Sequence, residues 1–481
     1  MSQRKPSCLV SLIPFVVLVA SMFCVIRFFG ADALDGASQV SLLIAGGVAA
    51  AISILLYKQP WKDFEDSISK NIRNIASALL ILILIGAISG SWMISGVVPT
   101  LIYYGMQIMT PGIFLFATCI ISALVSLMTG SSWTTIATIG VALIGIGTAQ
   151  GFSPGWTAGA IISGAYFGDK MSPLSDTTVL ASSSAGTPLF SHIKYMMITT
   201  VPSFTIACII FLIYSIFHKA PAELQTAEIA DALKASFNIS PFLLLVPLFT
   251  GFLIVKKVPA LQTLFLAAMV AGLTALIAQP EIIHNIATGG TEPFSGLSFE
   301  NGFKGVMVSW YGSTAIETGN ELLNGLVCTS GINGMLSTIF LIICAVSFGG
   351  IMMGNGMLQS ITEQLSKAVR SRTALVSSSV TSGIFFNMIT GDQYLSIILN
   401  CNLFKKLYKE LGYEPKLLSR SAEDSATVTS VLIPWNSCGM TQATVLKVAT
   451  LDYLPYCFFN LISPLLSIIV AAIGYRIVKS E

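Results

Sequence analysis

Long apolar stretches dominate this sequence and set the strongest limit on its fold. About ten runs of roughly 17 to 25 mostly apolar residues have the length that a helix needs to cross the hydrocarbon core of a bilayer. They begin near residues 9, 38, 75, 156, 195, 240, 258, 333, 421 and 453. The first run follows Arg4 and Lys5, but it is too long for a typical signal peptide, and no clear small-residue cleavage site follows it. We therefore predict an all-α, polytopic membrane protein.

The composition supports this prediction and excludes several other classes of protein. Hydrophobic residues make up 54% of the 481 residues and charged residues only 10%, whereas a soluble domain carries about 25% charged residues. The net charge of +2 indicates no nucleic-acid partner. The nine cysteines are scattered singly, so we expect neither a metal centre nor a disulfide framework. The sequence has no HExxH motif and no Ser–His pair suited to catalysis, so we predict no enzyme activity and no cofactor.

Basic residues mark the cytoplasmic side of a membrane protein. Their distribution agrees with about ten spans and places both termini in the cytoplasm. The residues that mark cytoplasmic segments are Arg4, Lys5, Lys58, Lys62, Lys70, Arg73, Lys194, Lys256, Lys257, Lys367, Arg370, Arg372, Lys405, Lys406, Lys409, Lys416, Arg420, Arg476 and Lys479. The loops near 31–37 and 280–303 contain no Lys or Arg and are predicted to lie outside.

Two apolar pairs, about 112–149 and 373–404, return to the side from which they start. The flanking basic residues indicate that the first pair returns to the outer side and the second to the inner side. Each pair follows one span and precedes two more, so the same order occurs twice with opposite orientation. We therefore predict a single membrane domain with two inverted halves, 1–217 and 240–481.

The turns of the two pairs are similar and polar. The first reads Met128-Thr129-Gly130-Ser131 and the second Ile389-Thr390-Gly391-Asp392. Two full spans would satisfy the charge pattern as well as a re-entrant hairpin does. The many Ser, Thr, Gly and Asn residues favour two re-entrant hairpins whose tips reach a buried site.

A polar cluster interrupts the span that begins near residue 156. It holds Asp169 and Asp176, and Pro173 between them breaks the helix and frees backbone carbonyl groups. Carboxylates, the hydroxyls of Ser175 and Thr177, and carbonyl groups are hard oxygen ligands that suit Na⁺. A cytoplasmic loop with solvated charges is the alternative. Lys170 could neutralise Asp169 or contact an anionic substrate.

A second cluster interrupts the span that begins near residue 421. Glu423 and Asp424 precede a break at Pro434, which Asn436 and Ser437 follow. The cluster repeats the combination of a broken helix and oxygen donors, so we predict that both carboxylates belong to the ion site. For Glu423, a boundary salt bridge with Arg420 is the alternative.

The hairpin tips supply further candidates. The hydroxyls of Ser131, Ser132 and Thr134 would lie opposite the first cluster, although such groups also bond back to helix carbonyls. Asp392 has no cation near it in sequence, so at a buried tip it would be a candidate proton carrier. An exposed turn is the alternative for Asp392.

Two segments resemble a known family. Residues 164–178, which read GAYFGDKMSPLSDTT, closely resemble the signature of NhaC-type Na⁺/H⁺ antiporters in the ion transporter superfamily. Residues 421–439 look like the second-half counterpart, and the resemblance extends over about 75–475. It implies Na⁺/H⁺ exchange across a bacterial plasma membrane, with two broken helices and two hairpins around a central site. It also implies that Asp169, Asp176 and Asp424 bind Na⁺ and protons.

Two transport functions follow as hypotheses. An antiporter needs carboxylates that bind either protons or Na⁺, and the three predicted carboxylates supply them. The alternative is a Na⁺- or H⁺-coupled exchanger of small organic anions such as a hydroxy acid or dicarboxylate, because some relatives transport organic acids. That alternative is weaker, since only Lys170 offers a cation to a carboxylate substrate. The expected partners are the lipid bilayer, Na⁺ and H⁺, and a homodimer remains open.

Overall fold

The computed structural model describes residues 6–29, 36–218, 223–367, 369 and 371–477. These residues are mostly helical, and the only strand pairing among them is the isolated bridge between Thr314 and Thr329. Eight of the described helices are long and apolar enough to cross a membrane, or up to ten if each of two bent pairs counts as one span. This confirms the prediction of an all-α, multi-spanning protein. The marker residues Arg4, Lys5, Arg370 and Lys479 lie outside the described residues.

Among the described residues, the first half of the chain contains ten α-helices, one short 3₁₀-helix (η2) and one short π-helix (η3). They are α1 (Cys8–Phe29), α2 (Ala37–Tyr57), α3 (Trp61–Ile94), α4 (Val97–Ile108), η2 (Pro111–Ile113), α5 (Phe114–Thr129), α6 (Ser132–Thr135), η3 (Ile136–Gly140), α7 (Val141–Ala149), α8 (Pro154–Met171), α9 (Asp176–Ala185) and α10 (Leu189–Phe217).

The second half of the chain is also helical, but many of its helices are shorter and more often interrupted. They are α11 (Glu223–Ser236), η4 (Pro241–Leu244), α12 (Leu245–Val255), α13 (Ala260–Ala278), α14 (Pro280–Thr288), α15 (Phe299–Tyr311), α16 (Glu321–Val327), α17 (Gly331–Gly354), α18 (Met357–Lys367), α19 (Arg372–Thr390), α20 (Gln393–Glu410), α21 (Pro415–Ala422), η5 (Glu423–Thr427), η6 (Ser430–Leu432), α22 (Ser437–Leu446), α23 (Thr450–Tyr453), η7 (Leu454–Tyr456) and α24 (Phe458–Ile473).

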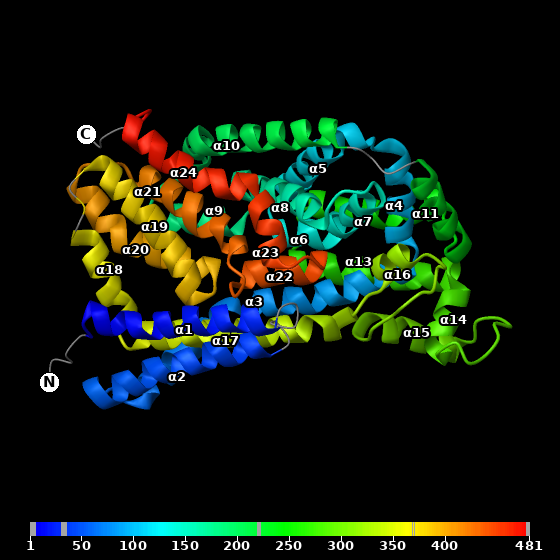
Figure 1. Ribbon diagram of the computed structural model, residues 1–481, viewed down its shortest axis with the longest axis horizontal. Helices are drawn as coiled ribbons and strands as arrows, with labels where there is room; N and C mark the ends of the chain where they lie inside the picture. The colour runs from blue at the N-terminus through cyan, green and yellow to red at the C-terminus, as the bar shows by residue number, and fades with distance from the viewer. Residues whose placement is uncertain (1–5, 30–35, 219–222, 368, 370, 478–481) are drawn as a thin grey trace.

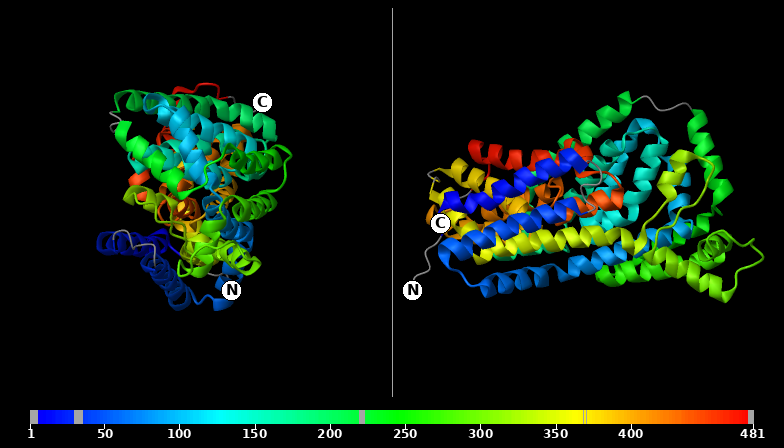
Figure 2. Two further views of the ribbon diagram at one scale, coloured as in Figure 1. Left: turned by 90° about the vertical axis from the view of Figure 1, so that its right-hand side faces the viewer. Right: turned by 60° about the horizontal axis from the view of Figure 1, so that its bottom comes forward.

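The long helices run along the long axis of the molecule and enclose the broken ones. Helices α1, α2, α3 and α17 form one layer along one side, and α10 runs along the opposite side (Figures 1 and 2). The start of α1, the end of α24 and the turn between α20 and α21 lie at the same end of the long axis (Figure 1). That end carries the most basic of the predicted cytoplasmic segments, residues 405–420.

Proline breaks two of the predicted spans where the sequence places it. Helix α8 ends at Met171 and α9 begins at Asp176, on either side of Pro173. The run from α21 through η5 and η6 ends before Pro434, and α22 begins at Ser437. Proline has no N–H group and clashes with the preceding turn, which favours a break at these two positions, although α1, α10 and α24 each continue through a proline. Both interruptions lie inside the bundle rather than at its ends (Figure 1).

The two predicted hairpins differ in how apolar their arms are. The arms of the first, Pro111–Thr129 and Ser132–Ala149, are each long and apolar enough to cross a membrane by length and composition. The arms of the second, α19 and α20, are not among the helices that pass this test. Length and composition therefore do not separate a re-entrant hairpin from two spans here, and the re-entrant assignment stays a prediction.

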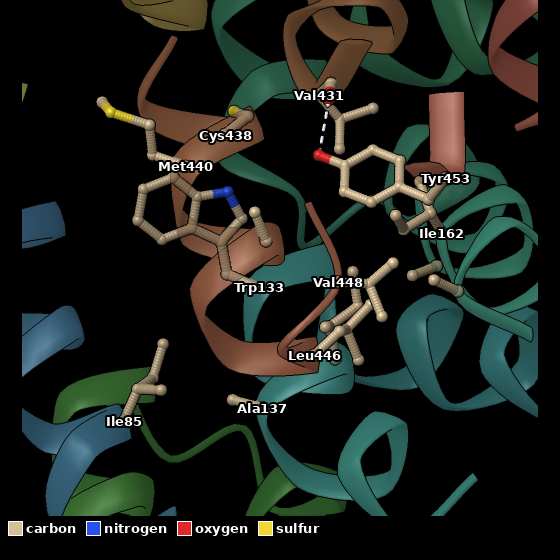
Figure 3. Packing of buried hydrophobic residues seen from close by; sticks show 14 of the residues in the cluster. Ile85, Trp133, Ala137, Ile162, Val431, Cys438, Met440, Leu446, Val448 and Tyr453 are labelled. Atoms are coloured by element: carbon tan, nitrogen blue, oxygen red, sulfur yellow. Dashed lines mark hydrogen bonds between the residues drawn. The ribbon is translucent and has the colours of Figure 1, made fainter. Parts of the chain in front are cut away.

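Part of the main buried cluster lies where the first hairpin meets the second broken helix. Trp133 of α6 packs with Cys438 and Met440 of α22 in one buried cluster, and Ile85 of α3 borders it (Figure 3). Tyr453 belongs to the same cluster, and its hydroxyl donates a hydrogen bond to the Val431 carbonyl oxygen at 2.8 Å (Figure 3). Large exposed apolar side chains such as Phe217, 80% exposed, lie on the outside of the bundle, as expected for a surface in contact with lipid.

Close packing of α5 against α8 depends on glycine. A Cβ atom at Gly164 would lie 2.1 Å from the Cys119 carbonyl oxygen. We expect Gly164→Ala to lower the free energy of unfolding by about 1–3 kcal/mol, because two backbones would have to separate. The matched control is Gly47→Ala in α2, where nothing lies within 4 Å of the added atom. Thermal unfolding in detergent measures both, and equal melting temperatures for the two variants would contradict the assigned contact.

Candidate functional site

The tip of the first hairpin seats against the first helix break. Gly130 at the tip has a φ of 65°, and a Cβ there would lie 2.7 Å from the Leu174 carbonyl carbon. Ser131 caps the returning arm, because its Oγ accepts a hydrogen bond from the Thr134 backbone N–H at 3.2 Å. Thr129 holds the turn by accepting a hydrogen bond from the Ser131 N–H at 3.1 Å. The tip therefore reaches the broken segment between α8 and α9, as the sequence predicts.

Asp169 lies in the last turn of α8 and faces this tip. Its side chain is 5% exposed, and its Oδ2 accepts hydrogen bonds from the Ser132 N–H at 3.1 Å and the Ser132 hydroxyl at 2.7 Å. The helical arm that begins at Ser132 directs its N-terminal end at the carboxylate, which favours negative charge there. The structure thus joins two of the predicted site residues, Asp169 and Ser132.

A cavity of about 600 Å³ opens beside Asp169. Asp176, which is exposed at the start of α9, also lines it. The further polar lining residues are Asn74, Ser77, Thr129, Ser131, Thr134, Thr177, Lys257, Thr263, Gln393 and Tyr394. Of the predicted oxygen donors near the break, Ser175 bonds to Thr177 at 3.0 Å. Lys257, between α12 and α13, belongs to a predicted cytoplasmic segment, so we expect the cavity to open toward the cytoplasm.

Lys170 and Asp424 form an ion pair away from this cavity. Both side chains are completely buried, and neither residue is among those that line the cavity. Asp424 also accepts hydrogen bonds from the Thr199 hydroxyl at 2.9 Å and the Ser463 hydroxyl at 3.1 Å. Arg420 lies next to it, with 3.8 Å between Arg420 Nε and Asp424 Oδ2. Lys170 therefore bonds to Asp424 rather than to its sequence neighbour Asp169.

The three carboxylates predicted to share Na⁺ do not come together in this conformation. Asp169 and Asp176 line one cavity, whereas Asp424 faces α10 and α24 through Thr199 and Ser463. Within the described ranges, no group of three or more His, Cys, Asp or Glu side chains could hold a metal ion. A cation in the cavity would therefore rely on two carboxylates with hydroxyl and carbonyl oxygens.

Glu423 is the second carboxyl of the second cluster. It is completely buried at the start of η5, and neither of its oxygens has a hydrogen-bond partner among the described residues. Arg420, the alternative salt-bridge partner, has its guanidinium 4.8 Å from the centre of the Tyr195 ring. The structure shows no ion pair between Arg420 and Glu423 among the described residues, while it does show the one between Arg420 and Asp424.

Asp392 at the second tip is buried rather than exposed. Its Oδ1 accepts the Leu395 N–H at 2.9 Å, so it caps α20, and its Oδ2 lies 3.4 Å from the Ser437 hydroxyl. The Ser437 N–H donates to the Gly391 carbonyl oxygen at 2.7 Å. Asn436 donates to the Asn387 carbonyl oxygen at 3.1 Å. The second tip is thus bonded to the second helix break, and three predicted residues meet there.

The two tips repeat the same hydrogen bonds at a constant spacing. Thr129 bonds to Thr135 as Thr390 bonds to Ser396, and the two pairs of residue numbers each differ by 261. The same spacing relates the bond from Ser126 to the Ala165 carbonyl and the bond from Asn387 to the Ala426 carbonyl. It also relates the two tip glycines, the two prolines and the two cap residues, which are Gly130 and Gly391, Pro173 and Pro434, and Ser175 and Asn436.

Several residues of the site were not predicted. Gln393 and Tyr394 bring the second hairpin into the wall of the cavity. Thr199 and Ser463 are hydroxyl residues in ordinary apolar spans that contain other Ser and Thr residues, so nothing in their sequence context distinguishes them. A sequence signal does exist for Gln393, because it directly follows the predicted tip residue Asp392.

Comparison with known proteins identifies the family. Residues 7–185 and 164–475 match the model of the Na⁺/H⁺ antiporter family. The chain belongs to this family. This match confirms the resemblance of residues 164–178 to NhaC-type antiporters. The relatives described next are named as antiporters, which are transporters and not enzymes.

Three named relatives match most of the chain. The Na⁺/H⁺ antiporter NhaC of Alkalihalophilus pseudofirmus is 35% identical over 467 residues, which cover 97% of each chain. The Na⁺/H⁺ antiporter NhaC of Bacillus subtilis is 35% identical over 426 residues, 88% of this chain and 90% of that one. The malate-2H⁺/Na⁺-lactate antiporter of Bacillus subtilis is 33% identical over 462 residues, 95% of this chain and 94% of that one.

Proposed function

We propose that this protein exchanges Na⁺ for H⁺, and that the two ions compete for Asp169 and Asp176. The observation that carries the proposal is a partly enclosed cavity with two carboxylates in its wall, while Lys170 is bonded to Asp424. Lys257 is the only Lys or Arg side chain among the described lining residues. A negative cavity lined with hydroxyls suits a hard monovalent cation.

Protonation of the same carboxylates would release the cation. A protonated carboxyl carries no charge and offers one fewer acceptor to Na⁺, so binding of one ion opposes binding of the other. Competition of this kind is sufficient for exchange if the site opens alternately to the two sides. In this proposal Asp424 acts through its ion pair with Lys170, and Asp392 and Glu423 stay predicted participants.

The proposal is tested with the purified protein in liposomes that contain a pH-sensitive dye. A proton gradient is imposed, and Na⁺ is then added outside. Immediate loss of the gradient on addition of Na⁺, but not of choline, is the expected result. An active preparation that responds to neither Na⁺, Li⁺ nor K⁺ would reject cation/proton exchange.

Competition makes a quantitative prediction about pH. Below the pH at which the cavity carboxylates lose their protons, we expect the half-saturating Na⁺ concentration to rise about tenfold for each unit of falling pH, because one proton replaces one Na⁺. Initial rates of dye response at several Na⁺ concentrations and pH values measure this. A half-saturating concentration that does not change over two pH units would show that the ions bind independently.

Exchange of small organic anions is the second candidate. Two observations favour this candidate. One relative is a malate-2H⁺/Na⁺-lactate antiporter, and the cavity volume of about 600 Å³ is larger than the volume that a single Na⁺ occupies. Against it, Lys170 is already neutralised by Asp424, and the remaining cation is Lys257. Proton movement that requires a hydroxy acid in addition to Na⁺, and that is lost in Lys257→Ala, would support this candidate instead.

The proposal includes the cellular location and the membrane topology of the protein. We place it as a multi-pass protein in a bacterial plasma membrane, with both termini in the cytoplasm. The family and the apolar surface support the membrane setting. The predicted cytoplasmic termini, the inverted halves and a homodimer stay proposals that accessibility and cross-linking measurements can test.

A further inference from the structure

Two distant segments bring basic side chains to the mouth of the cavity. Lys257, at the turn between α12 and α13, lines the cavity, and so do Asn74 and Ser77 of α3. Lys70 precedes Asn74 by one turn of α3, so the two side chains lie on the same face of the helix. Lys70 therefore stands next to the lining residues, one turn nearer the predicted cytoplasmic end. Two segments that were predicted separately to be cytoplasmic meet at one opening.

Two further basic residues stand beside this opening. Arg73 directly precedes the lining residue Asn74, and Lys256 directly precedes Lys257. We call Lys70, Arg73, Lys256 and Lys257 the basic rim, and all four residues are exposed. Within the described ranges, none of these four side chains forms an ion pair or a hydrogen bond. The basic rim thus carries positive charge for which the described chain supplies no bonded partner.

Another predicted cytoplasmic segment, residues 405–420, differs in this respect. The Nζ atom of Lys406 lies 3.6 Å from Oε1 of Glu410. Lys416 is paired with Glu414. The positive-inside rule explains why both segments are basic, but it does not explain why the charges stay unpaired only where the cavity opens. The difference indicates that the basic rim has a partner outside this chain.

The basic rim lies at the depth expected for lipid headgroups. Arg73 is the last charged residue of α3 before its apolar part, and Lys256 and Lys257 directly follow the apolar helix α12. The large apolar side chains of Leu80 on α3 and Phe252 on α12 are 52% and 55% exposed. The Nζ atom of Lys256 lies 5.6 Å from the centre of the Phe252 ring. Basic groups at this depth bind anionic headgroups, while apolar side chains nearby contact acyl chains.

We infer that the basic rim binds the phosphate headgroup of an anionic phospholipid, and that this lipid eases the entry of Na⁺ into the cavity. The positive rim repels a cation that approaches Asp169 and Asp176, and a bound phosphate group cancels this repulsion. A lipid fits better than free phosphate, because its acyl chains contact exposed side chains such as Leu80 and Phe252. The inference rests on the proposed function, since it concerns how Na⁺ reaches the two cavity carboxylates.

Binding is tested with the purified full-length protein by native mass spectrometry. The protein is offered phosphatidylglycerol and phosphatidylcholine with the same acyl chains. We expect the wild type to retain phosphatidylglycerol preferentially, and Arg73→Gln with Lys256→Gln to retain at least about fivefold less of it. The matched control is Lys406→Gln with Lys409→Gln, two exposed basic residues away from the cavity lining, which should retain as much as the wild type. Soluble glycerol phosphate should not displace the lipid.

The effect on transport is measured in liposomes with and without phosphatidylglycerol, at constant ionic strength. The surface potential of the bilayer raises the local Na⁺ concentration for every variant alike. We expect anionic lipid to lower the half-saturating Na⁺ concentration at least about threefold more in the wild type, and in the Lys406→Gln with Lys409→Gln control, than in Arg73→Gln with Lys256→Gln.

Three results would overturn the inference. They are equal retention of the two lipids by the wild type, displacement of phosphatidylglycerol by glycerol phosphate, and the same lipid dependence of Na⁺ saturation in the wild type and in Arg73→Gln with Lys256→Gln. The binding measurement does not depend on transport. If the wild type retains the anionic lipid selectively but Na⁺ moves no protons, the proposed ions are wrong and the lipid site stands.

Discussion

Asp169→Asn is expected to reduce Na⁺-driven proton movement to the level of protein-free liposomes. The substitution keeps the size of the side chain and an acceptor for the Ser132 hydroxyl, but removes a charge from a site that is 5% exposed. Loss of one charge from a buried pair of opposite charges costs about 3–5 kcal/mol. Lost Na⁺ affinity of that size is about 100-fold or more. The dye-loaded liposome assay gives the rate directly.

Two controls make this result specific to the site. Asp452→Asn removes an exposed carboxylate in α23, outside the cavity lining, and is expected to keep the wild-type rate. The Asp169→Asn protein must also show the melting temperature of the wild type, so that loss of folding does not explain its inactivity. Full Na⁺-driven exchange by a well-folded Asp169→Asn variant would remove Asp169 from the mechanism.

Lys170→Met is expected to destabilise the protein strongly. It leaves the Asp424 carboxylate completely buried, with Arg420 Nε at 3.8 Å as its nearest described cationic group. Breaking a buried ion pair by removal of one partner typically costs about 3–5 kcal/mol. We expect a clearly lower melting temperature in detergent, whereas Lys62→Met, at an exposed position of α3, should have little effect.

The double variant Lys170→Met with Asp424→Asn separates the pair from its members. Removal of both charges leaves no unpaired carboxylate, but it takes from buried Arg420 its ion-pair partner Asp424, so we expect recovery of only part of the lost stability. Exchange activity is not expected to recover with it if the pair takes part in transport. A double variant whose loss of stability equals the sum of the losses in Lys170→Met and Asp424→Asn alone would show that the two residues do not interact in the folded protein.

The sequence predicts the broken helices and tips because each depends on local chemistry. Pro173 and Pro434 end their helices for reasons that act within one turn, and the helix ends lie where the sequence places them. The meeting of Asp169 with Ser132 also follows from local sequence, since a tip and a break were expected at one buried point. Length and hydropathy together find eight spans among the described helices, and the helices that flank Pro173 and Pro434 are not among them.

Contacts between distant segments could not be predicted in the same way. Lys170 and Asp424 are far apart in the chain, and their meeting depends on how α8 packs against η5. Residues 169 and 170 are neighbours, yet on a helix adjacent side chains point about 100° apart, so one faces the cavity and the other faces Asp424. Arg420 was expected at a boundary, but packing against Tyr195 of α10 buries it completely.

The bonds between each hairpin tip and the broken helix of its own half have a mechanical consequence. The Ser126 hydroxyl donates a hydrogen bond to the Ala165 carbonyl oxygen, and the Asn387 side-chain amide donates one to the Ala426 carbonyl oxygen. A tip that separated from its helix would therefore leave these buried groups without their partners. We expect each hairpin to move together with its helix as one stiff block that displaces the surrounding lipid as it moves. The work of deforming the bilayer then enters the activation barrier, and the exchange rate should vary with the acyl-chain length of the host membrane.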